Sequence, residues 1–506
     1  MTISSPSACA KEKLIFLFLL ISVFTHAQKR NAIWCFGDSA GIDFNNLNNP
    51  SPILTSLDTR GSCVSISDST GHLLFYANTR ATVGYPSTLV WSKNNLLMDN
   101  GDSIIGEGWF NELVIIPFPD SDSLFYLFSI CQSSGLGLFY SIIDLHLNGG
   151  LGSVIQKNVL LNSSIPNGVI KTIKHGNGRD WWLIYRTFDV PDNNYVIYMI
   201  TPYGISQPQV QYIGSNLTAE TGDIDFTPDG NKLLIVNWHG LIQLMDFDRC
   251  TGTFSNPEII QPDTWSTPLY LGCAFSPDAN KIYVTSVYQG AGAEFSYLYQ
   301  YDLLDTNIAL SKDTLYTFTA PDVPRTLRRG PDNKIYLSTC YETPGVFAYP
   351  YADSVRNSTN ENLSVINSPD SLGPMCDFAP FSFYLGGKRT YYGLPNNPDY
   401  DLKSDSGSFC DTLLNVSSMD VFGEKPEINI FYHPSWQKLF INGKNLKSHI
   451  CIITLFDLTG KVLFQKLEDS NSLNFSTSIS CGDFSNGIYL IAVQTEYDCI
   501  IKTFFK

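Results

Sequence analysis

The chain has 506 residues, which is too long for one ordinary hydrophobic core, so we expect several domains or a repeat domain with an appendage. Its hydrophobic fraction of 43% is that of a folded protein, and a charged fraction of 16% with 13% aromatic residues fits an all-β protein better than a helical one. The net charge of -16 argues against a nucleic-acid partner, because a phosphate-binding surface needs a basic patch and no such patch stands out.

The first residues predict a signal peptide, residues 1–27. Lys11 and Lys13 precede the apolar run Leu14–Phe24, and Thr25–Ala27 provides the small side chains that a signal peptidase requires. The apolar run is shorter than the roughly 20 residues of a permanent membrane helix, and no other segment is long and apolar enough to span a membrane. We therefore expect the chain to be cleaved after Ala27 and exported through the periplasm, and we expect no transmembrane anchor.

One pattern of strand, turn and strand recurs at intervals of roughly fifty residues. Its three clearest copies contain a Pro-Asp turn and span Asp225–Val236, Ala274–Thr285 and Arg328–Ser338. Three weaker copies lie nearer the N-terminus, at Val64–Tyr76, Val114–Phe128 and Ile170–Tyr185. A single hairpin cannot bury its own apolar faces, so a repeat of this period predicts a propeller or a solenoid.

The turn residues explain why each copy forms a hairpin locally. In the turn Thr227–Gly230, the proline fixes φ, Asp229 bonds the local backbone and the glycine adopts a positive φ. In the second copy Ala279 replaces this glycine, and we expect Asn280 to adopt the left-handed conformation instead. The strands that follow are apolar without strict alternation, which predicts sheets covered on both faces, as in the blades of a propeller.

The six copies leave two further strand-like stretches, Asn31–Phe44 and Met375–Leu385. Strands from both ends of the chain share the last blade in many propellers, so we expect these stretches to close the ring. We therefore predict a seven-bladed β-propeller over residues 28–394, with six and eight blades as open alternatives. The polar, turn-rich sequence that follows predicts a linker over residues 395–426.

Residues 427–506 predict a small β-sandwich at the C-terminus. Its expected strands are Lys438–Ile441, Ile450–Phe456, Lys461–Gln465, Ile488–Gln494 and Ile500–Phe505. The Leu458–Gly460 turn is expected to join the second and third of these strands as a hairpin.

Five motifs occur in order in this C-terminal unit: Ile430–Pro434, Leu439–Ile441, Leu455–Val462, Asn486–Leu490 and the basic end Ile501–Lys506. Together they resemble the type A C-terminal sorting domain of the Bacteroidetes type IX secretion system. His433 stands where these domains usually have Asn. The resemblance implies that the type IX secretion machinery is a partner and that the mature protein is secreted or attached to the outer cell surface.

The N-terminal part carries a second, broader resemblance. Its motifs are Ile33–Phe44, Gly71–Tyr76, Val365–Pro369 and Gly393–Asn396. They are similar to those of a group of secreted Bacteroidetes propellers, and the Pro-Asp hairpins resemble the repeats of WD-like and YVTN-type propellers. This resemblance implies a propeller fold and transfers no activity or site residue.

No motif predicts a catalytic or metal site. Gly37–Gly41 matches the G-x-S-x-G pattern, but a nucleophile elbow needs a helix after Ser39 and the next residues are poor helix formers, so we interpret Ser39 as a turn residue. The histidines lack a zinc spacing, although His175 and His239 could still meet in the fold. The paired aspartates do not complete a calcium loop. We therefore predict no cofactor, no metal and no catalytic residue.

Twelve cysteines minus Cys9, which is lost with the signal peptide, leave eleven in the mature chain, so at least one thiol stays unpaired. An exported protein can form disulfides, and we consider Cys376 with Cys410 and Cys451 with Cys499 as candidate pairs. Buried free thiols are the alternative.

The residues just before each repeated strand share one register, so they are expected to lie around one rim of the ring. They are Arg60, Asn111, Glu112, Asn167, Glu220, Tyr270 and Arg325. Because propeller ligands usually meet the loops at one end of the ring, we predict that these residues bind a glycan or a protein. The alternative is that they are ordinary solvated loop residues.

We predict a secreted or surface binding module, because rigid blades with variable loops suit recognition and no catalytic constellation emerges. The first alternative is a polysaccharide lyase or glycoside hydrolase, and the second is a structural component of a surface assembly. Two carboxylates, or an Arg with a His or Tyr, within about 6 Å of one another in a deep funnel would favour the enzyme. A shallow aromatic rim containing Trp109 and Tyr270 would favour binding.

Overall fold

The fold is known from a computed structural model. The residues that it describes are 29–80, 87–216, 219–264, 269–287, 294–341, 355–408, 410–411, 427–434, 436–444, 450–457, 461–469, 475–485, 487–494 and 499–506. The predicted signal peptide, residues 1–27, and the predicted turn Leu458–Gly460 lie outside them. The described elements are β-strands and three short 3-10 turns, which confirms the all-β fold class. In this part of the chain no helix has the length and apolar character needed to cross a bilayer.

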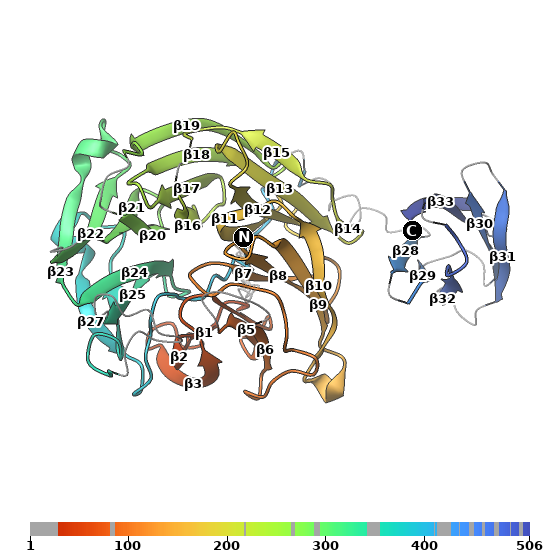
Figure 1. The fold of residues 1–506 in the computed structure, drawn as a ribbon, viewed down its shortest axis with the longest axis horizontal. Helices are drawn as coiled ribbons and strands as arrows, with labels where there is room; N and C mark the ends of the chain where they lie inside the picture. The colour runs from red at the N-terminus through yellow and green to blue at the C-terminus, as the bar shows by residue number, and fades with distance from the viewer. Residues whose placement is uncertain are drawn as a thin grey trace, which may run out of the picture.

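The strands from Ile33 to Tyr384 form seven antiparallel sheets, and each sheet is built from strands that are consecutive in sequence (Figure 1). Sheet 1 contains β1 (Ile33–Phe36), β2 (Asp38–Asp43) and β3 (Ser51–Asp58). Sheet 2 contains β4 (Cys63–Ser67), β5 (Leu73–Thr79) and β6 (Thr88–Ser92). Sheet 3 contains β7 (Leu113–Pro117), β8 (Leu124–Cys131), β9 (Gly137–Asp144) and β10 (Ser153–Asn162), with the 3-10 turn η1 (Asn148–Gly150).

The remaining four sheets of this part follow the same order. Sheet 4 contains β11 (Pro166–Lys174), β12 (Trp181–Thr187), β13 (Asn194–Thr201), β14 (Gly204–Ile205) and β15 (Gln209–Tyr212). Sheet 5 contains β16 (Thr221–Phe226), β17 (Lys232–Asn237), β18 (Ile242–Asp248) and β19 (Thr253–Gln261). Sheet 6 contains β20 (Leu269–Phe275), β21 (Lys281–Val287), β22 (Phe295–Asp302), η2 (Ile308–Ser311) and β23 (Asp313–Thr319). Sheet 7 contains β24 (Asp322–Arg329), β25 (Ile335–Tyr341), β26 (Asn362–Ile366), η3 (Gly373–Cys376) and β27 (Phe378–Tyr384).

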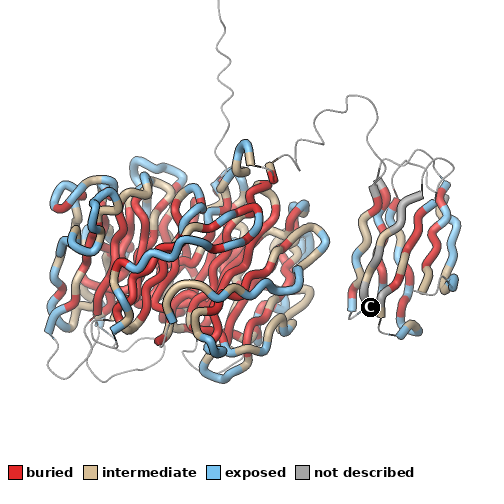
Figure 2. The backbone as a smooth tube through the Cα atoms, turned by 90° about the horizontal axis from the view of Figure 1, so that it is seen from above, coloured by how far each residue is buried: buried red, intermediate tan, exposed pale blue. Residues whose placement is uncertain are grey.

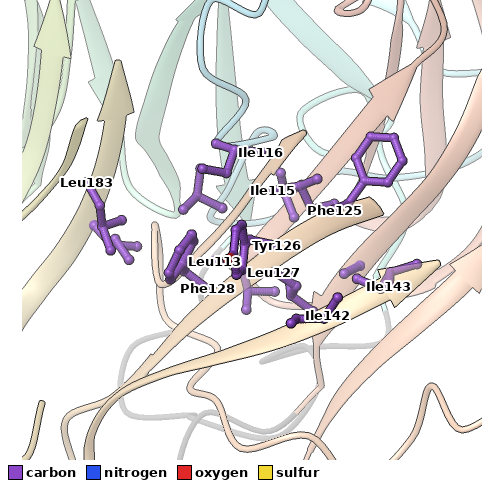
Figure 3. Packing of buried hydrophobic residues seen from close by; sticks show 14 of the residues in the cluster. Leu113, Ile115, Ile116, Phe125, Tyr126, Leu127, Phe128, Ile142, Ile143 and Leu183 are labelled. Atoms are coloured by element: carbon purple, nitrogen blue, oxygen red, sulfur yellow. The ribbon is translucent and has the colours of Figure 1, made fainter. Parts of the chain in front are cut away.

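Neighbouring sheets pack face to face around a closed, propeller-like ring. One apolar cluster joins sheets 2, 3 and 4, and Figure 3 shows the part of it near Leu113 and Phe128. Further clusters join sheet 4 to 5, sheet 5 to 6 and sheet 6 to 7. Trp34 of sheet 1 meets Tyr336 of sheet 7 edge to face, with ring centroids 5.7 Å apart, which closes the circle. Buried residues accordingly fill the interior of the ring (Figure 2).

The repeated Pro-Asp turns join the two innermost strands of sheets 5, 6 and 7, as the hairpin pattern predicts. In the first turn the Asp229 carboxylate accepts a hydrogen bond of 3.0 Å from the backbone N two residues on, and Gly230 has φ +78°. In the second turn the residue with positive φ is Ala279, at 60°, so the prediction for Asn280 is wrong. Asn333 has φ 63° in the third turn. The left-handed position therefore directly follows the Asp in all three copies, whichever residue occupies it.

The two stretches that were expected to share a blade lie in different sheets. The first forms β1 and β2 of sheet 1, and the second forms the outer strand β27 of sheet 7. The prediction of a shared blade is therefore wrong, because sheet 7 is already complete with four consecutive strands. The two ends of this region meet instead in a single bridge between Asp38 and Arg389.

After this bridge the chain runs through the middle of the ring as residues 389–408 and 410–411, which we call the axial segment (cyan in Figure 1). The side-chain amide of Asn396 donates to the carbonyl oxygens of Leu113, at 3.0 Å, and Ile170, at 2.9 Å. The Tyr400 hydroxyl donates to the carbonyl oxygen of Ile115 at 3.0 Å. Asn396 and Tyr400 are 1% and 0% exposed. The axial segment thus satisfies backbone carbonyls that the inner strands direct toward the axis.

The axial segment corrects the predicted linker. Residues 395–408 and 410–411 lie within the ring, and the rest of the predicted linker lies outside the described residues. The segment passes so close to sheet 2 that a Cβ on Gly393 would lie 2.0 Å from the carbonyl oxygen of Gly61. Only a glycine allows this approach.

A disulfide between Cys250 and Cys410, with Cα atoms 5.6 Å apart, fastens the end of the axial segment to sheet 5. The predicted pair of Cys376 with Cys410 is therefore wrong, and Cys376 is a buried free thiol in sheet 7. The physical reason is the path of the axial segment, which carries Cys410 away from sheet 7 to the turn that follows β18.

The C-terminal unit has two sheets around one core. Sheet 8 contains β28 (Glu427–His433), β29 (Lys438–Lys444) and β32 (Phe475–Ser480), and sheet 9 contains β30 (Ile450–Asp457), β31 (Val462–Asp469), β33 (Ile488–Gln494) and β34 (Cys499–Phe505). Leu439 of sheet 8 and Ile453 of sheet 9 are fully buried in the shared cluster, as in a sandwich. The predicted hairpin of β30 and β31 is confirmed. The predicted Cys451–Cys499 pair is wrong, because β33 separates their strands and Cys451 is a buried free thiol.

Candidate binding sites at the two ends of the ring axis

The axis of the ring has two distinct ends. The Pro-Asp turns lie at one of them, the turn end, and the residues that precede the innermost strands lie at the other, the rim end. Four of the seven predicted rim residues precede these strands, and Asn167, Tyr270 and Arg325 lie in the first half of β11, β20 and β24. Six of them are 3% exposed or less, and Glu220 is half-buried. They are therefore not solvated loop residues, and their binding of a ligand stays a prediction.

Two of the predicted residues meet on the axial segment. The guanidinium carbons of Arg60 and Arg325 lie 5.1 Å and 4.2 Å from the centre of the Tyr392 ring. Arg60 also lies 5.3 Å from the Trp109 ring, and Phe110 stacks on Tyr392 with centroids 5.6 Å apart. Such cation-π and stacking contacts give this end of the axis a packed aromatic floor.

We call this aromatic and arginine set the rim cluster. It consists of Arg60, Trp109, Phe110, Trp238, Arg325, Tyr391 and Tyr392. Trp109 and Trp238 are half-buried, whereas the two tyrosines are 2% exposed. The arginines and Trp109 were predicted from the sequence, whereas Trp238 and the tyrosines were not, because their sequence neighbours resemble an ordinary loop.

Carboxylates surround the rim cluster and are held by the backbone. Glu112 accepts hydrogen bonds from the backbone N of Trp109, at 3.0 Å, and of Phe110, at 2.7 Å. Glu107 accepts from the Trp109 indole at 3.1 Å and from the backbone N of residue 132 at 2.6 Å. Burial, with repulsion from Glu107, raises the pKa of Glu112 well above its usual range, and the same two causes raise the pKa of Glu220. The hydrogen bonds that they accept hold the Glu112 and Glu107 carboxylates in fixed positions.

Asn111 belongs to a buried polar network that crosses the axis. Its side-chain amide donates to Asp223 at 2.7 Å, and its side-chain carbonyl accepts from Arg328 at 2.6 Å. Arg328 also pairs with Asp223 at 2.8 Å. The network therefore connects sheets 3, 5 and 7 across the middle of the ring. The Asn111 side chain thus makes structural hydrogen bonds within the fold.

Asn167 and Tyr270 also make internal contacts. The Asn167 side chain accepts a hydrogen bond from the backbone N of Thr221 at 2.7 Å. The Tyr270 hydroxyl donates to Gln261 at 2.8 Å, and its side chain is fully buried. The structure thus brings Arg60, Glu112 and Arg325 to the rim cluster and leaves Asn167 and Tyr270 within the sheets.

At the turn end, a cavity of about 360 Å³ lies between the axial segment and the inner strands β11, β16 and β24. Its charged lining residues include Lys171, Asp225, Arg328, Arg329, Asp399 and Asp401, and Phe44, Ile173 and Phe226 contribute an apolar wall. The size and the mixed lining are those of small-molecule sites. This cavity was not predicted from the sequence, and its one sequence signal is the pair of lysines, Lys171 and Lys174, inside the inner strand β11.

The structure also shows the surroundings of two weaker candidates, the possible nucleophile Ser39 and the possible histidine pair. Ser39 has φ 60° and is followed by the rest of strand β2, so it is a turn-like residue without the helix that a nucleophile elbow requires. His175 bonds the carbonyl oxygen of Cys250 at the turn end, whereas His239 lies 3.5 Å from Asp263 at the rim end. Over the described ranges, no group of three or more His, Cys, Asp or Glu side chains could hold a metal ion.

These observations define an all-β protein with a closed propeller-like ring and a C-terminal β-sandwich. Residues 429–506, which make up this sandwich, match the family described as the secretion system C-terminal sorting domain. The match confirms the resemblance to type IX sorting domains, and it marks the chain for secretion to the cell surface or beyond it. No protein in the curated collection matches the chain.

Several solved structures are similar to this chain at low identity. A 6-phosphogluconolactonase candidate from Bacteroides uniformis is 12% identical, with a TM-score of 0.42, over 67% of this chain and 100% of that one. Another from Bacteroides fragilis is 12% identical, with a TM-score of 0.34, over 81% and 99%. The β-propeller domain of Cps50 (Swd1) from Myceliophteria thermophila is 12% identical, with a TM-score of 0.33, over 64% and 85%.

Proposed function

We propose that the seven sheets are the blades of a seven-bladed β-propeller that serves as an exported binding module and recognises a glycan at its rim end. In this proposal the propeller extends to residue 411 and residues 427–506 deliver it. The rim cluster is the observation that supports it most. Trp109 and Trp238 keep half-buried aromatic faces in a frame that packing on Phe110 and Tyr392 makes rigid. Flat aromatic faces beside fixed polar groups suit the apolar faces and hydroxyls of a sugar.

The state of the carboxylates supports binding over catalysis. A general acid or base must be free to exchange a proton with the substrate. Glu112 and Glu107 instead use their oxygens to accept hydrogen bonds from backbone N atoms and the Trp109 indole. They are thereby fitted to position the Trp109 loop for a ligand.

One observation favours a polysaccharide lyase as a second candidate. Arg60 lies over the rings of both Tyr391 and Tyr392, at 5.6 Å and 5.1 Å. In such an elimination the arginine neutralises the uronate carboxylate, one tyrosine takes the C5 proton as its phenolate, the C4–O bond breaks, and the other tyrosine protonates the leaving oxygen. Both tyrosines are 2% exposed, so this reaction would require them to move toward the substrate.

A glycan array and a turnover assay on the exported chain, residues 28–506, test the proposal. We expect selective glycan binding that Trp238→Ala weakens by about tenfold or more, because an aromatic anchor in a site contributes on this scale. Tyr212→Ala is the matched control, since Tyr212 is 59% exposed on the outer strand β15, away from the axis.

The outcomes separate the candidates. If the chain releases unsaturated sugar products and Tyr392→Phe abolishes this release, the protein is a lyase and the binding-module proposal is wrong. Capture of a protein but of no glycan would keep the module and change its ligand class. An empty array together with no turnover would favour a structural component of a surface assembly.

A further inference from the structure

The turn-end cavity is a second candidate site, at the opposite end of the axis from the rim cluster. It is bounded on one side by the axial segment at Asn397–Leu402 and on the other by the inner strands β11, β16 and β24. None of the rim-cluster residues lines it. Its chemistry can therefore be considered independently of the proposed glycan site.

Lys171 is the most unusual group in this cavity. It is 7% exposed, and its side-chain ammonium group makes no hydrogen bond or ion pair with any residue that the structure describes. Burial, with repulsion from Arg328, lowers the pKa of Lys171 to about 8, although Asp223, Asp225 and Cys273 oppose this shift. A buried ammonium group without a partner is costly, so a fold keeps it where something else provides the counter-charge.

The nearby carboxylates are already occupied. Asp223 pairs with Arg328 at 2.8 Å, and Asp225 accepts a hydrogen bond of 3.0 Å from the backbone N of Phe275. Asp225 and Asp401 nevertheless line the cavity and are only partly buried. The cavity therefore offers a positive charge without a partner together with acceptors that can take hydrogen bonds from hydroxyl groups.

We propose that the turn-end cavity binds a small sugar acid, whose carboxylate pairs with Lys171 and whose hydroxyls donate to Asp225 and Asp401. Phe44 and Phe226 supply the apolar wall for the C–H face of such a ligand. A neutral sugar would leave the Lys171 ammonium group unpaired, and a simple carboxylate without hydroxyls would not use the two aspartates. The combination in one ligand satisfies both sets of groups.

Calorimetric titration of the exported chain, residues 28–506, with glucuronate tests this assignment. Glucose and acetate are the comparison ligands, since each carries one half of the required chemistry. We expect glucuronate to bind at least about tenfold more tightly than either, because a charged hydrogen bond in a buried site is worth this much. Equal affinities for glucuronate and glucose, or no binding of glucuronate, would overturn the proposal.

Lys171→Met is the decisive variant, and Lys232→Met is its matched control. Lys232 lies at the same end of the ring but is exposed and paired with Asp246 outside the cavity. We expect Lys171→Met to lose glucuronate binding by about tenfold or more and Lys232→Met to keep it. Trp238→Ala, at the rim end, should also leave glucuronate affinity unchanged, which separates this site from the glycan site.

Thermal unfolding without ligand distinguishes a binding role from a structural one. If Lys171 is kept for a ligand, Lys171→Met removes an uncompensated buried charge at similar volume, so the ligand-free variant should unfold at the same or a higher temperature than the parent chain. A lower unfolding temperature of the folded variant, with glucuronate affinity unchanged, would make Lys171 structural and end the proposal. Glucuronate should raise the unfolding temperature of the parent chain and of Lys232→Met, and it should not raise that of Lys171→Met.

Discussion

The two ends of the ring axis use buried charge in opposite ways. At the rim end the Glu112 carboxylate is matched by backbone N atoms, and Arg325 lies over an aromatic ring. At the turn end Lys171 is also buried, yet its ammonium group makes no ion pair or hydrogen bond with a described residue. Burial of a charged side chain is therefore not enough to identify a ligand site in this protein. The fold itself provides the partners of the buried charges at the rim end, whereas the charge of Lys171 is the one for which we proposed a ligand.

The axial segment produces this contrast. Near the rim end, Tyr391 and Tyr392 fill the axis and complete the rim cluster. Toward the turn end, Tyr400 turns to Ile115 of sheet 3 and packs near Trp181 of sheet 4, with ring centroids 6.2 Å apart. The segment therefore leaves the cavity open on the side of sheets 5 and 7.

The largest effect is expected from removing the part of the axial segment that was predicted as a linker. A chain that ends at Leu394 loses the buried Tyr400 and the two Asn396 hydrogen bonds to sheets 3 and 4. Loss of a large buried aromatic side chain alone costs about 3–5 kcal/mol, a large part of the stability of an ordinary domain. We expect this chain to show no cooperative thermal transition. A chain that ends at Asp411 is the control and should unfold cooperatively; equal behaviour of the two would restore the original boundary.

The second effect concerns the network that separates the two ends. Asp223→Ala leaves the buried Arg328 charge without its carboxylate, so we expect the free energy of unfolding to fall by about 3–5 kcal/mol. Urea unfolding measures it. Adding Arg328→Met to this variant should recover a substantial part of the loss, because the pair is then replaced and not broken. If the double variant is as unstable as the single one, packing and not charge explains the role of Asp223.

The hairpins show how much of the ring could be predicted. β17, β21 and β25 each follow a Pro-Asp turn, and these turns are specified by residues adjacent in sequence. The axial segment could not be predicted in this way. Its polar, turn-rich composition is typical of a linker, and Asn396 is buried only because carbonyl groups from two distant strands accept its hydrogen bonds. Strands β28 and β32 were not predicted for the same reason, because their pairing with β29 depends on contacts outside their own sequence.

The candidate sites follow the same division. The register of the repeats predicted seven rim residues, and each of them lies before an innermost strand or in its first half. It could not show that Asn111 bonds Asp223, since the two are 112 residues apart in sequence. Lys171 was overlooked because a lysine in a strand is usually exposed. Its significance appears only when the partners of the neighbouring carboxylates are known.

The pH dependence of stability tests the charge of another residue of the turn-end cavity, Asp401. Burial, with repulsion from Asp399, raises the pKa of Asp401 to about 6. The folded state then holds this proton more tightly than the unfolded chain, so the stability it provides is complete below about pH 4 and is lost as the pH rises through about 6. We expect Asp401→Asn to reduce this pH dependence and to raise the free energy of unfolding at pH 7 by about 1 kcal/mol, allowing for solvent screening. Asp122→Asn, at an exposed turn, should change neither.

The smallest effect tests whether the turns are as local as the repeat implies. Ala279 holds φ 60° at the position where Gly230 holds +78° in the preceding copy. A left-handed conformation costs a residue with a Cβ about 1–2 kcal/mol, and the freedom of glycine in the unfolded chain offsets part of this. Ala279→Gly should therefore raise the free energy of unfolding by about 0.5–1 kcal/mol.

The reciprocal change should not be its mirror image. A Cβ on Gly230 would lie 2.6 Å from Ile173 Cδ1 and 3.0 Å from Leu402 Cδ2, so this turn is also packed against β11 and the axial segment. Gly230→Ala should then cost more than Ala279→Gly gains, because backbone strain and steric overlap add. Equal and opposite changes in urea unfolding would mean that the two turns differ only in their own residues and that the axial segment plays no part in the turn end.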